Sequence, residues 1–285
     1  MEAHERPWRS VLYIPGSKER ALEKARSLPV DAIIFDLEDA VAPDEKAQAR
    51  EVLAAALAEG GYGARVRIVR INGLETEWGA DDAATAARMG CDAVLMPKVG
   101  SPEDVERLAQ LIPDLPIWAM METPGGCLNA AAIAAHPRLQ GFVMGTNDLA
   151  KDLGARFRPD RLSMMAALQI CLMAARASGV ICVDGVYNAF KDADGLRREC
   201  EQGRDIGMDG KTLIHPAQIE IANQTFGPSA EDLDLAKRQI AAFGEAVAKG
   251  EGVAVVDGQI VENLHVATAR AMLAKARIIA QLEGK

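Results

Sequence analysis

Short apolar runs alternate along the chain with longer segments in which apolar residues recur at helical spacing. The short runs mostly lack polar alternation, which is typical of parallel strands buried on both faces. Eight such runs are present: Val11–Ile14, Ala32–Leu37, Val66–Ile71, Ala93–Met96, Ile117–Met121, Phe142–Met144, Val180–Val183 and Thr212–Ile214. Eight strands that alternate with helices favour an α/β protein built as a closed (β/α)₈ barrel, or TIM barrel.

A doubly wound open sheet is the alternative arrangement of such elements. That fold would carry a glycine-rich dinucleotide-binding turn after its first strand. The residues at this point read PGSKER, which does not match GxGxxG. The closed barrel is therefore the better interpretation.

Two of the helical segments follow residues that commonly cap helices. Ser17 precedes KERALEKAR, and Ser101 is followed by Pro102 and, at the third position, by Asp104. A serine cap, a first-turn proline and an acidic third residue together indicate the start of a helix. We expect helices to be capped by Ser17 and by Ser101.

Residues 1–226 suffice for the barrel, and residues 227–285 predict a separate C-terminal extension. A capped helix begins this extension at Ser229, and an amphipathic helix over residues 264–282 ends it. Between them lies VAVVDGQIV, whose central Asp-Gly pair is a strong signal for a two-residue β-hairpin turn. We expect this helix–hairpin–helix to act as a lid, or as an arm that reaches another subunit.

Net charge, apolar content and cysteine pattern limit the cellular compartment and the binding partners that we expect for the protein. The chain of 285 residues has a net charge of −9 and a pI near 5.1, which argues against a nucleic-acid partner. It shows no signal peptide and no apolar stretch of about 18 residues, so we expect no membrane partner. The five cysteines show no CxxC pairing, which favours reduced thiols and a cytoplasmic protein.

Polar residues follow nearly every apolar run, where the carboxyl ends of barrel strands form the active site. In chain order they are Asp36, Glu38, Asp39, Arg70, Asn72, Lys98, Glu122, Asn147, Asp148, Asp184 and His215. Several carboxylates and a few cations are thus predicted to converge on one mouth.

Glu122 and Asp148 end neighbouring strands, so their carboxylates can reach one point between them. Two carboxylates that leave room for water and a chelating substrate are the usual arrangement for Mg²⁺, or for Mn²⁺ in its place. Zinc is disfavoured because no His/Cys set has ligand spacing. The alternative is that each carboxylate caps the following helix, although Thr123 is a better cap than Glu122.

Arg70 closes an apolar strand and is expected to point inward, where it can bind a substrate carboxylate and stabilise an enolate. Asp36, Glu38 and Asp39 can orient metal-bound water. One or two of the three can instead be ion-paired supports for a lysine or arginine.

Two further residues have less certain roles. Lys98 can act as a point charge or, if buried, form a Schiff base, although no general signature supports the second role. His215 precedes Pro216 and is interpreted as a hydrogen-bonded structural residue rather than a base.

Several motifs occur in a fixed order: RSVLYIPGSKERALEKA, IIFDLEDAVAPDEKAQAR, VRIN, PKV, METPGG, GTNDLAKDLG and GKTLIHPAQ. Together they resemble the citrate lyase β-subunit and malyl-CoA lyase family of the phosphoenolpyruvate/pyruvate barrel superfamily. The resemblance covers residues 9–218 and extends into the tail VDGQIVENLHVATAR. It implies a Mg²⁺-dependent carbon–carbon lyase that cleaves or forms a malyl-, citramalyl- or citryl-type thioester from an acyl-CoA and a 2-keto acid.

The resemblance also implies roles for single residues. The metal ligands and the keto-acid contact would be Glu122, Asp148 and Arg70. From their position after the second apolar run, Glu38 and Asp39 are expected to complete the catalytic set. The N-terminal motif suggests that coenzyme A contacts Tyr13, Lys18 and Arg20.

In lyase members a lid carboxylate from a neighbouring subunit acts as acid or base, in a motif that reads G-x-M-V-D. Here Glu262 stands at the aspartate position. The longer side chain leaves the reaction open between the lyase, a malyl-CoA-type thioesterase, and a citrate lyase β-subunit that uses a carrier-bound thioester. A homo-oligomer, trimer or hexamer, is expected, and an acyl-carrier protein is a candidate partner.

Overall fold

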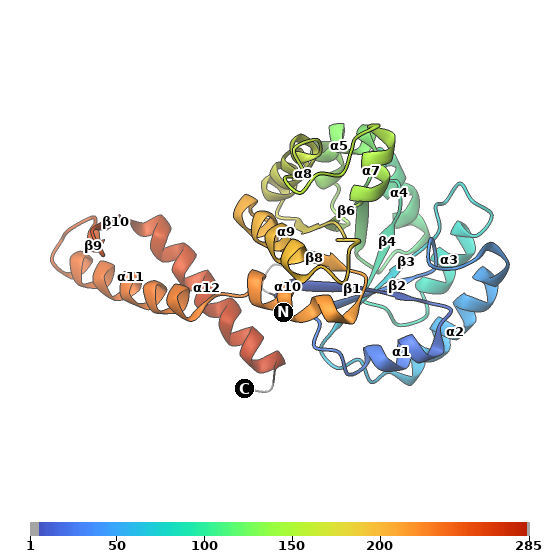
Figure 1. Cartoon of the computed structure of the whole chain (residues 1–285), viewed down its shortest axis with the longest axis horizontal. Coiled ribbons are helices and arrows are strands. Elements are labelled where there is room, and N and C mark those ends of the chain that lie inside the picture. The colour runs from blue at the N-terminus through green and yellow to red at the C-terminus, as the bar shows by residue number, and fades with distance from the viewer. Residues whose placement is uncertain (1–5, 284–285) are drawn as a thin grey trace.

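Eight parallel strands close into a barrel in the order β1 to β8 in the computed structural model, which describes residues 6–283 (Figure 1). The strands are β1 Ser10–Pro15, β2 Ala32–Asp36, β3 Val66–Arg70, β4 Ala93–Met96, β5 Ile117–Met121, β6 Leu139–Met144, β7 Ile181–Asp184 and β8 Gly210–Leu213. Each overlaps its predicted apolar run. The TIM barrel is confirmed.

Both faces of the strands are buried, which explains their uninterrupted apolar sequence. On β2, Ile33 and Phe35 belong to the core between barrel and helices, while Ala32 and Ile34 belong to the core inside the barrel. Within the barrel Trp8 packs against Trp118, with 4.7 Å between ring centroids. A Cβ at Gly141 would lie 2.4 Å from the Trp118 ring, so this position requires glycine.

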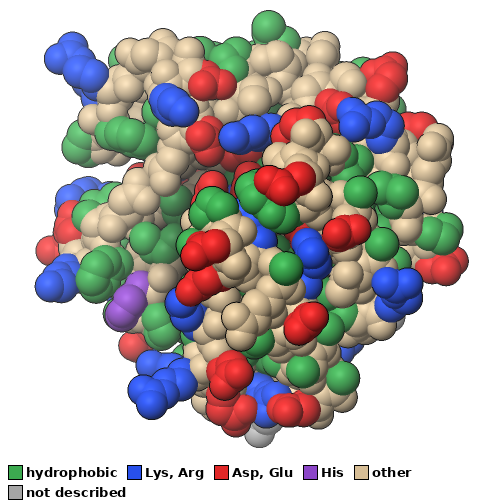
Figure 2. All heavy atoms as spheres, turned by 90° about the vertical axis from the view of Figure 1, so that its right-hand side faces the viewer, with side chains coloured by type: hydrophobic (Ala, Val, Ile, Leu, Met, Phe, Trp, Pro, Cys, Tyr) green, Lys and Arg blue, Asp and Glu red, His purple; other side chains and the backbone are tan. Residues whose placement is uncertain are grey.

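Helices surround the barrel: α1 Glu19–Ala25, α2 Lys46–Glu59, α3 Gly79–Ala86, α4 Pro102–Leu111, α5 Pro124–Leu128, α6 Ala130–Ala134, α7 Thr146–Asp152, α8 Met165–Ser178, α9 Ala193–Ile206 and α10 Ile219–Phe226, with 3₁₀ turns at Pro43–Glu45 and Pro216–Gln218. Within residues 6–283 no helix is long and apolar enough to cross a membrane. On the face turned away from the C-terminal arm, acidic and basic side chains are intermixed (Figure 2).

The two predicted helix caps have different outcomes. At α4 the prediction is confirmed, because the Asp104 carboxylate accepts a hydrogen bond from the backbone N–H of Ser101 at 3.0 Å. At α1 it is wrong, because Lys18 occupies the cap position and the Ser17 hydroxyl has no hydrogen-bond partner among the described residues. The backbone of the β1–α1 turn bonds to itself there, since Lys18 N–H donates to the Pro15 carbonyl.

The C-terminal residues form an arm that projects away from the barrel (Figure 1). It consists of α11 Ala230–Ala248, the hairpin β9 Ala254–Val256 and β10 Gln259–Val261, and α12 Asn263–Leu282. Asp257 and Gly258 both have positive φ, 49° and 77°, as a primed two-residue turn requires. The predicted hairpin is confirmed. Just after the C-terminal end of α12, the Glu283 carboxylate lies 3.1 Å from the Arg9 guanidinium of the barrel.

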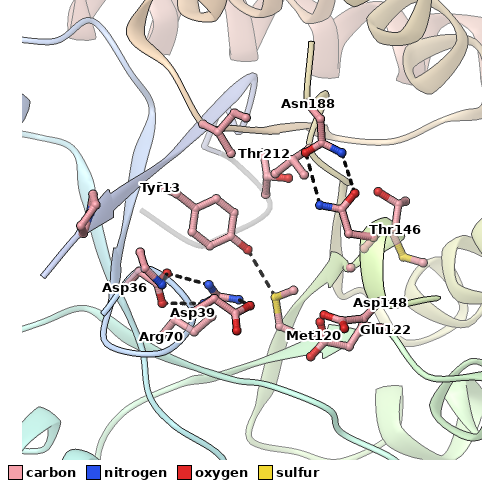
Figure 3. Close-up of a pocket in the computed structure, with 17 residues that line it drawn as sticks. Tyr13, Asp36, Asp39, Arg70, Met120, Glu122, Thr146, Asp148, Asn188 and Thr212 are labelled. Atoms are coloured by element: carbon pink, nitrogen blue, oxygen red, sulfur yellow. Dashed lines mark hydrogen bonds and ion pairs between the residues drawn. The ribbon is translucent and has the colours of Figure 1, made fainter. Parts of the chain in front are cut away.

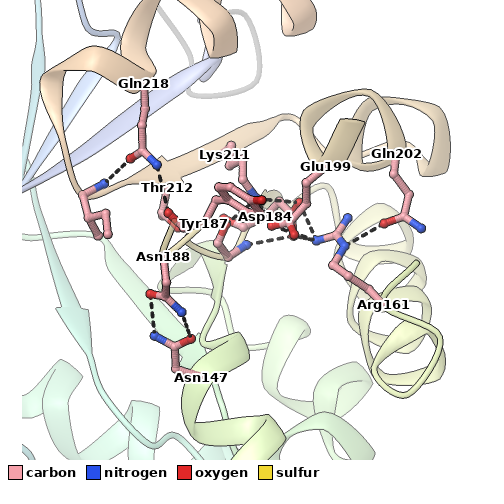
Figure 4. A network of polar contacts seen from close by, with 12 residues as sticks. Asn147, Arg161, Asp184, Tyr187, Asn188, Glu199, Gln202, Lys211, Thr212 and Gln218 are labelled. Atoms are coloured by element: carbon pink, nitrogen blue, oxygen red, sulfur yellow. Dashed lines mark hydrogen bonds and ion pairs between the residues drawn. The ribbon is translucent and has the colours of Figure 1, made fainter. Parts of the chain in front are cut away.

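A buried ionic network joins β7, β8 and α9 to the segment before α8 (Figure 4). Asp184 accepts hydrogen bonds from Arg161 at 2.7 Å and from Lys211 at 3.2 Å, and Lys211 also donates to Glu199 at 2.7 Å. Asp184 and Lys211 are fully buried. Burial opposes the charge on Asp184, but Lys211 and Arg161 outweigh it and hold the pKa of this carboxyl below its usual value.

Replacing Asp184 by alanine should therefore destabilise the barrel strongly. Lys211 and Arg161 would remain buried with too few counter-charges, and the free energy of unfolding should fall by about 3–5 kcal/mol. Urea denaturation followed by circular dichroism measures the change. The control is Asp234→Ala, which removes an exposed pair with Arg238 and should cost at most about 1 kcal/mol. Equal stability of the two variants would contradict the structural role of the network.

Candidate active site

A cavity of about 360 Å³ lies at the carboxyl ends of the strands (Figure 3). Its polar wall is formed by Tyr13, Asp36, Asp39, Arg70, Glu122, Thr146, Asn147, Asp148, Asn188 and Thr212. Pro15, Ala40, Met120, Met144, Val186 and Ile214 supply the apolar wall. The cavity gathers side chains from seven of the eight strands or the segments after them, all but β4, as the parallel barrel dictates.

Glu122 and Asp148 lie side by side in the cavity (Figure 3). Glu122 ends β5, is only 2% exposed, and accepts a hydrogen bond from the backbone N–H of Lys98 at 2.7 Å. Asp148 lies in the first turn of α7, whose N-cap is Gly145, so helix capping does not account for its carboxylate. Within residues 6–283 the Asp148 side chain makes no hydrogen bond, which leaves its oxygens free for a ligand.

Gly145 makes room for this carboxylate pair. A Cβ at residue 145 would lie 2.3 Å from the Cβ of Glu122 and 2.6 Å from its Oε2. A larger residue would displace the Glu122 side chain. Close packing between the ends of β5 and β6 therefore sets the position of Glu122.

The electrostatics of the pair fit a divalent cation. Burial raises the pKa of Glu122 to about 7; the Lys98 N–H opposes this rise, and the nearby charge of Asp148 adds to it. A cation between two carboxylates would relieve both burial and repulsion. Hard oxygen donors suit Mg²⁺ or Mn²⁺, and Mg²⁺ commonly takes only one or two carboxylates together with water. Among the described residues no group of three or more His, Cys, Asp or Glu side chains forms a metal cage.

Arg70 lies on the opposite wall, held by Asp36. The Arg70 Nε and one terminal nitrogen donate to the two Asp36 oxygens at 2.7 and 2.6 Å. Asp36 also accepts backbone N–H groups of Glu38 and Ala40, which folds the loop after β2 around it. The guanidinium lies over the Tyr13 ring, 5.0 Å from its centroid. The prediction that some of the β2 carboxylates are ion-paired supports is confirmed for Asp36.

Glu38 and Asp39 flank the second terminal nitrogen of Arg70. Glu38 lies 2.8 Å from it and Asp39 3.4 Å, and the Asp39 side chain is 69% exposed. Burial raises the pKa of Glu38 to about 8, against the charge of Arg70, and the charges of Asp39 and Glu122 add to the rise. The structure brings both residues to Arg70, and their catalytic roles remain predictions.

The residues predicted to contact coenzyme A are separated in the structure. Tyr13 forms part of the cavity wall, and its hydroxyl donates to the Met120 sulfur at 3.3 Å. Lys18 and Arg20 are exposed and line a different groove of about 370 Å³. In that groove Lys18 lies 3.4 Å from Glu45.

Glu262 lies outside the cavity of its own chain. It is exposed and immediately follows β10, at the end of the arm far from the barrel (Figure 1). Its backbone N–H donates to His265 Nδ1 at 3.0 Å. Any role for its carboxylate in the reaction requires a second copy of the chain.

The surroundings of Lys98 disfavour a Schiff base, and His215 makes a hydrogen bond of the kind predicted for a structural residue. Lys98 is exposed; burial lowers its pKa, but Glu38, Asp148 and Glu122 outweigh burial and raise it, which disfavours a Schiff-base lysine. His215 Nδ1 accepts a hydrogen bond from Ala217 N–H at 3.1 Å, and its ring stacks on Phe190.

Sequence reasoning missed Asn188, Thr146 and Thr212 in the cavity wall. Asn188 lies in the loop after β7 and forms a reciprocal amide pair with Asn147, at 2.8 and 3.3 Å. Asn188 lies in none of the sequence motifs, and its hydrogen-bond partner Asn147 is 41 residues away in the chain. Its place after the seventh apolar run was the only available signal.

The chain matches the family model described as HpcH/HpaI aldolase/citrate lyase over residues 9–216. A (3S)-malyl-CoA thioesterase of Cereibacter sphaeroides is 67% identical over 279 residues, covering 98% of this chain and 97% of the relative. The citrate lyase subunit beta of Leuconostoc mesenteroides subsp. cremoris is 34% identical over 295 residues, covering 99% and 98%. The solved structure of protein CitE from Mycobacterium tuberculosis in complex with magnesium, acetoacetate and coenzyme A has a TM-score of 0.80 and 30% identity, covering 95% of this chain and 98% of that one.

Replacing Glu122 by glutamine, or Asp148 by asparagine, would remove a proposed ligand of the ion. Loss of a residue that only orients a metal ligand weakens metal binding by roughly 10–100-fold, so these variants should bind Mg²⁺ more weakly still. Isothermal titration calorimetry measures the affinity. The control is Glu51→Gln, at an exposed position on α2, which should bind as the unchanged protein does. Unaltered affinity in both site variants would refute the metal assignment.

Mg²⁺ binding should also depend on pH. Glu122 must lose its proton to bind the ion, and its pKa is about 7 in the metal-free protein. The affinity should therefore be level above pH 7 and fall about tenfold per pH unit well below it. Calorimetry in buffers of different ionisation enthalpy should detect a proton released on binding below pH 7, and no release at pH 6 would contradict this account.

Proposed function

The chain belongs to the HpcH/HpaI aldolase/citrate lyase family, as its motifs predicted, and from this premise we propose that it hydrolyses a malyl-type coenzyme A thioester with Mg²⁺ as cofactor. The observation that carries the proposal is the 67% identity, over nearly the full length of both chains, to a protein named (3S)-malyl-CoA thioesterase. The lyase predicted from the sequence is supported at the level of the family only. Hydrolysis, the alternative left open there, becomes the first hypothesis.

Glu122 and Asp148 would hold the Mg²⁺ ion. The two neighbouring carboxylates repel each other, and Asp148 makes no side-chain hydrogen bond among the described residues; both facts support this role, and so does the magnesium in the related M. tuberculosis structure. A bound ion would supply a Lewis acid for the carboxylate and hydroxyl oxygens of the substrate.

Arg70 binds the carboxylate of the hydroxy acid in this proposal. Asp36 fixes the guanidinium through two of its nitrogens, which leaves the third directed at Glu38 and Asp39. Asp39 is exposed and its contact is long, so a substrate carboxylate can replace it without uncovering a buried charge.

The arm completes the site from a neighbouring copy. Val255, Ile260 and Leu264 near its end are more than 60% exposed, and apolar side chains gathered in this way favour self-association. Residues 227–285 would then serve a barrel of residues 1–226 in the next subunit of a trimer or hexamer. Glu262 would act there as acid or base.

Coenzyme A would extend from the cavity past Tyr13 toward Lys18 and Arg20. The exposed cations of Lys18, which precedes α1, and of Arg20 in α1 suit its phosphates. The M. tuberculosis relative contains coenzyme A, which supports a free CoA thioester over one carried by an acyl-carrier protein.

Carbon–carbon cleavage is the second candidate function. A cavity with paired carboxylates opposite an arginine also suits polarisation of a keto oxygen, and the family includes citrate lyase β-subunits. The products would then be acetyl-CoA and a 2-keto acid.

Product analysis separates the two reactions. We expect purified protein with malyl-CoA and Mg²⁺ to release free CoA and malate, and EDTA or Glu122→Gln to abolish turnover. Glu51→Gln should remain active. Chromatography of the CoA species measures the outcome, and acetyl-CoA with glyoxylate in place of free CoA and malate would establish the lyase instead.

A further inference from the structure

A cavity separate from the active site lies at the amino ends of the barrel strands. It has a volume of about 280 Å³ and is lined by Arg6, Trp8, Gly63, Ala64, Arg65, Val66, Arg67, Asp92 and Gln140. Arg65 and Asp92 directly precede β3 and β4, which places the cavity at this end of the barrel. Active sites of barrel enzymes form at the carboxyl ends of the strands, and the proposed hydrolysis uses none of these residues.

The charges around this cavity are unequal. Three arginines line it, and Asp92 is the one carboxylate among its lining residues in the described part of the chain. Arg67 engages both oxygens of that carboxylate, because its Nε and Nη2 donate to them at 3.0 and 2.8 Å. Asp92 therefore balances Arg67. Arg6 and Arg65 form no ion pair with a carboxylate of residues 6–283, although the whole chain carries a net charge of −9.

The turn at residues 62–65 holds Arg6 and Arg65 close together. The Arg6 guanidinium donates to the carbonyl of Ala64, and Arg65 Nη1 donates to the carbonyl of Tyr62 at 3.0 Å. Arg65 Nε donates to the carbonyl of Leu28 at 2.6 Å. Both cations are thus fixed by neutral carbonyls, and two cations fixed on one turn repel each other unless an anion offsets their charge.

Hydrogen-bond donors remain unused around the cavity. Arg65 Nη2 makes no hydrogen bond to the described residues, and Arg6 Nε is buried there without an acceptor. Gln140 Oε1 accepts a hydrogen bond from Trp118 Nε1 at 2.9 Å, which orients the amide and leaves its nitrogen unbonded within residues 6–283. Burial lowers the pKa of Arg65, and no carboxylate opposes this effect. A bound anion would compensate the partly buried charge.

We propose that this cavity binds a dianionic phosphate group, either as free phosphate or at the end of a small phosphate monoester. The guanidiniums of Arg6 and Arg65 match the two negative charges of the group, and their planar N–H edges match its oxygens. A monocarboxylate would leave one of the two cations without a counter-charge. The cavity is larger than a phosphate group, so part of an attached organic group fits as well.

Isothermal titration calorimetry with sodium phosphate tests the site, at about pH 8 where phosphate is a dianion, at constant ionic strength and with EDTA present. We expect Arg6→Gln and Arg65→Gln each to weaken phosphate binding by about tenfold or more, because each removes a charge-assisted contact. Arg88→Gln removes an exposed arginine outside the cavity and should bind phosphate as the unchanged protein does. Glycerol phosphate is titrated in the same way, and tighter binding than that of free phosphate would identify the ligand as a monoester.

The proposal is independent of CoA release, so each of its failures is recognised without an activity assay. If millimolar phosphate gives no heat of binding, the site does not exist. Equal affinity of the unchanged protein and both variants would place the anion elsewhere, and equal or tighter binding of succinate would overturn the assignment to phosphate. If Arg65→Gln does not fold, Arg6→Gln decides, since the Arg6 side chain donates to a single carbonyl among the described residues.

Discussion

The ion pair between Asp36 and Arg70 is the contact on which the arrangement of this site depends. The two residues are register partners on β2 and β3, so the pairing of the strands itself brings the carboxylate to the guanidinium. Both are almost fully buried, and Asp36 without Arg70 would be left as a buried carboxylate with no cation paired to it among the described residues. Because Asp36 also accepts two backbone N–H groups of the next loop, the same contact shapes the segment that carries Glu38 and Asp39.

The rest of the site follows from an excess of buried negative charge. One arginine is shared by Asp36, Glu38 and Asp39, and the same Arg70, the backbone N–H of Lys98 and the exposed Lys98 side chain act on Glu122. Burial is the main reason that the pKa values of Glu38 and Glu122 are raised, and the neighbouring carboxylates add to the rise. A divalent cation would offset this excess, which supports the metal role proposed for Glu122 and Asp148.

Behind the cavity a second ionic network, around Asp184 and Lys211, is balanced within itself. It ties the last strands to α9 and anchors the loop that carries Asn188. The arm is built differently. It has a small apolar core of its own, formed by residues such as Val256, Val261 and Val266, and one ion pair from Glu283 back to the barrel. The arm is therefore held together mainly by its own contacts, away from the cavity in the barrel.

The sequence alone determined the strands, the hairpin and the ring of polar residues. Strands buried on both faces need unbroken apolar runs, an Asp-Gly turn needs positive φ, and parallel strands bring all their carboxyl ends together. Each of these is a local rule, so eight runs were enough to place Glu122, Asp148 and Arg70 at one mouth. Tertiary structure decided everything that depends on which side chains meet. It made Asp36 the main partner of Arg70, separated Tyr13 from Lys18 and Arg20, and paired Asn147 with Asn188. Such contacts join residues that are distant in the chain, and distances of a few ångströms between them arise only when the barrel closes.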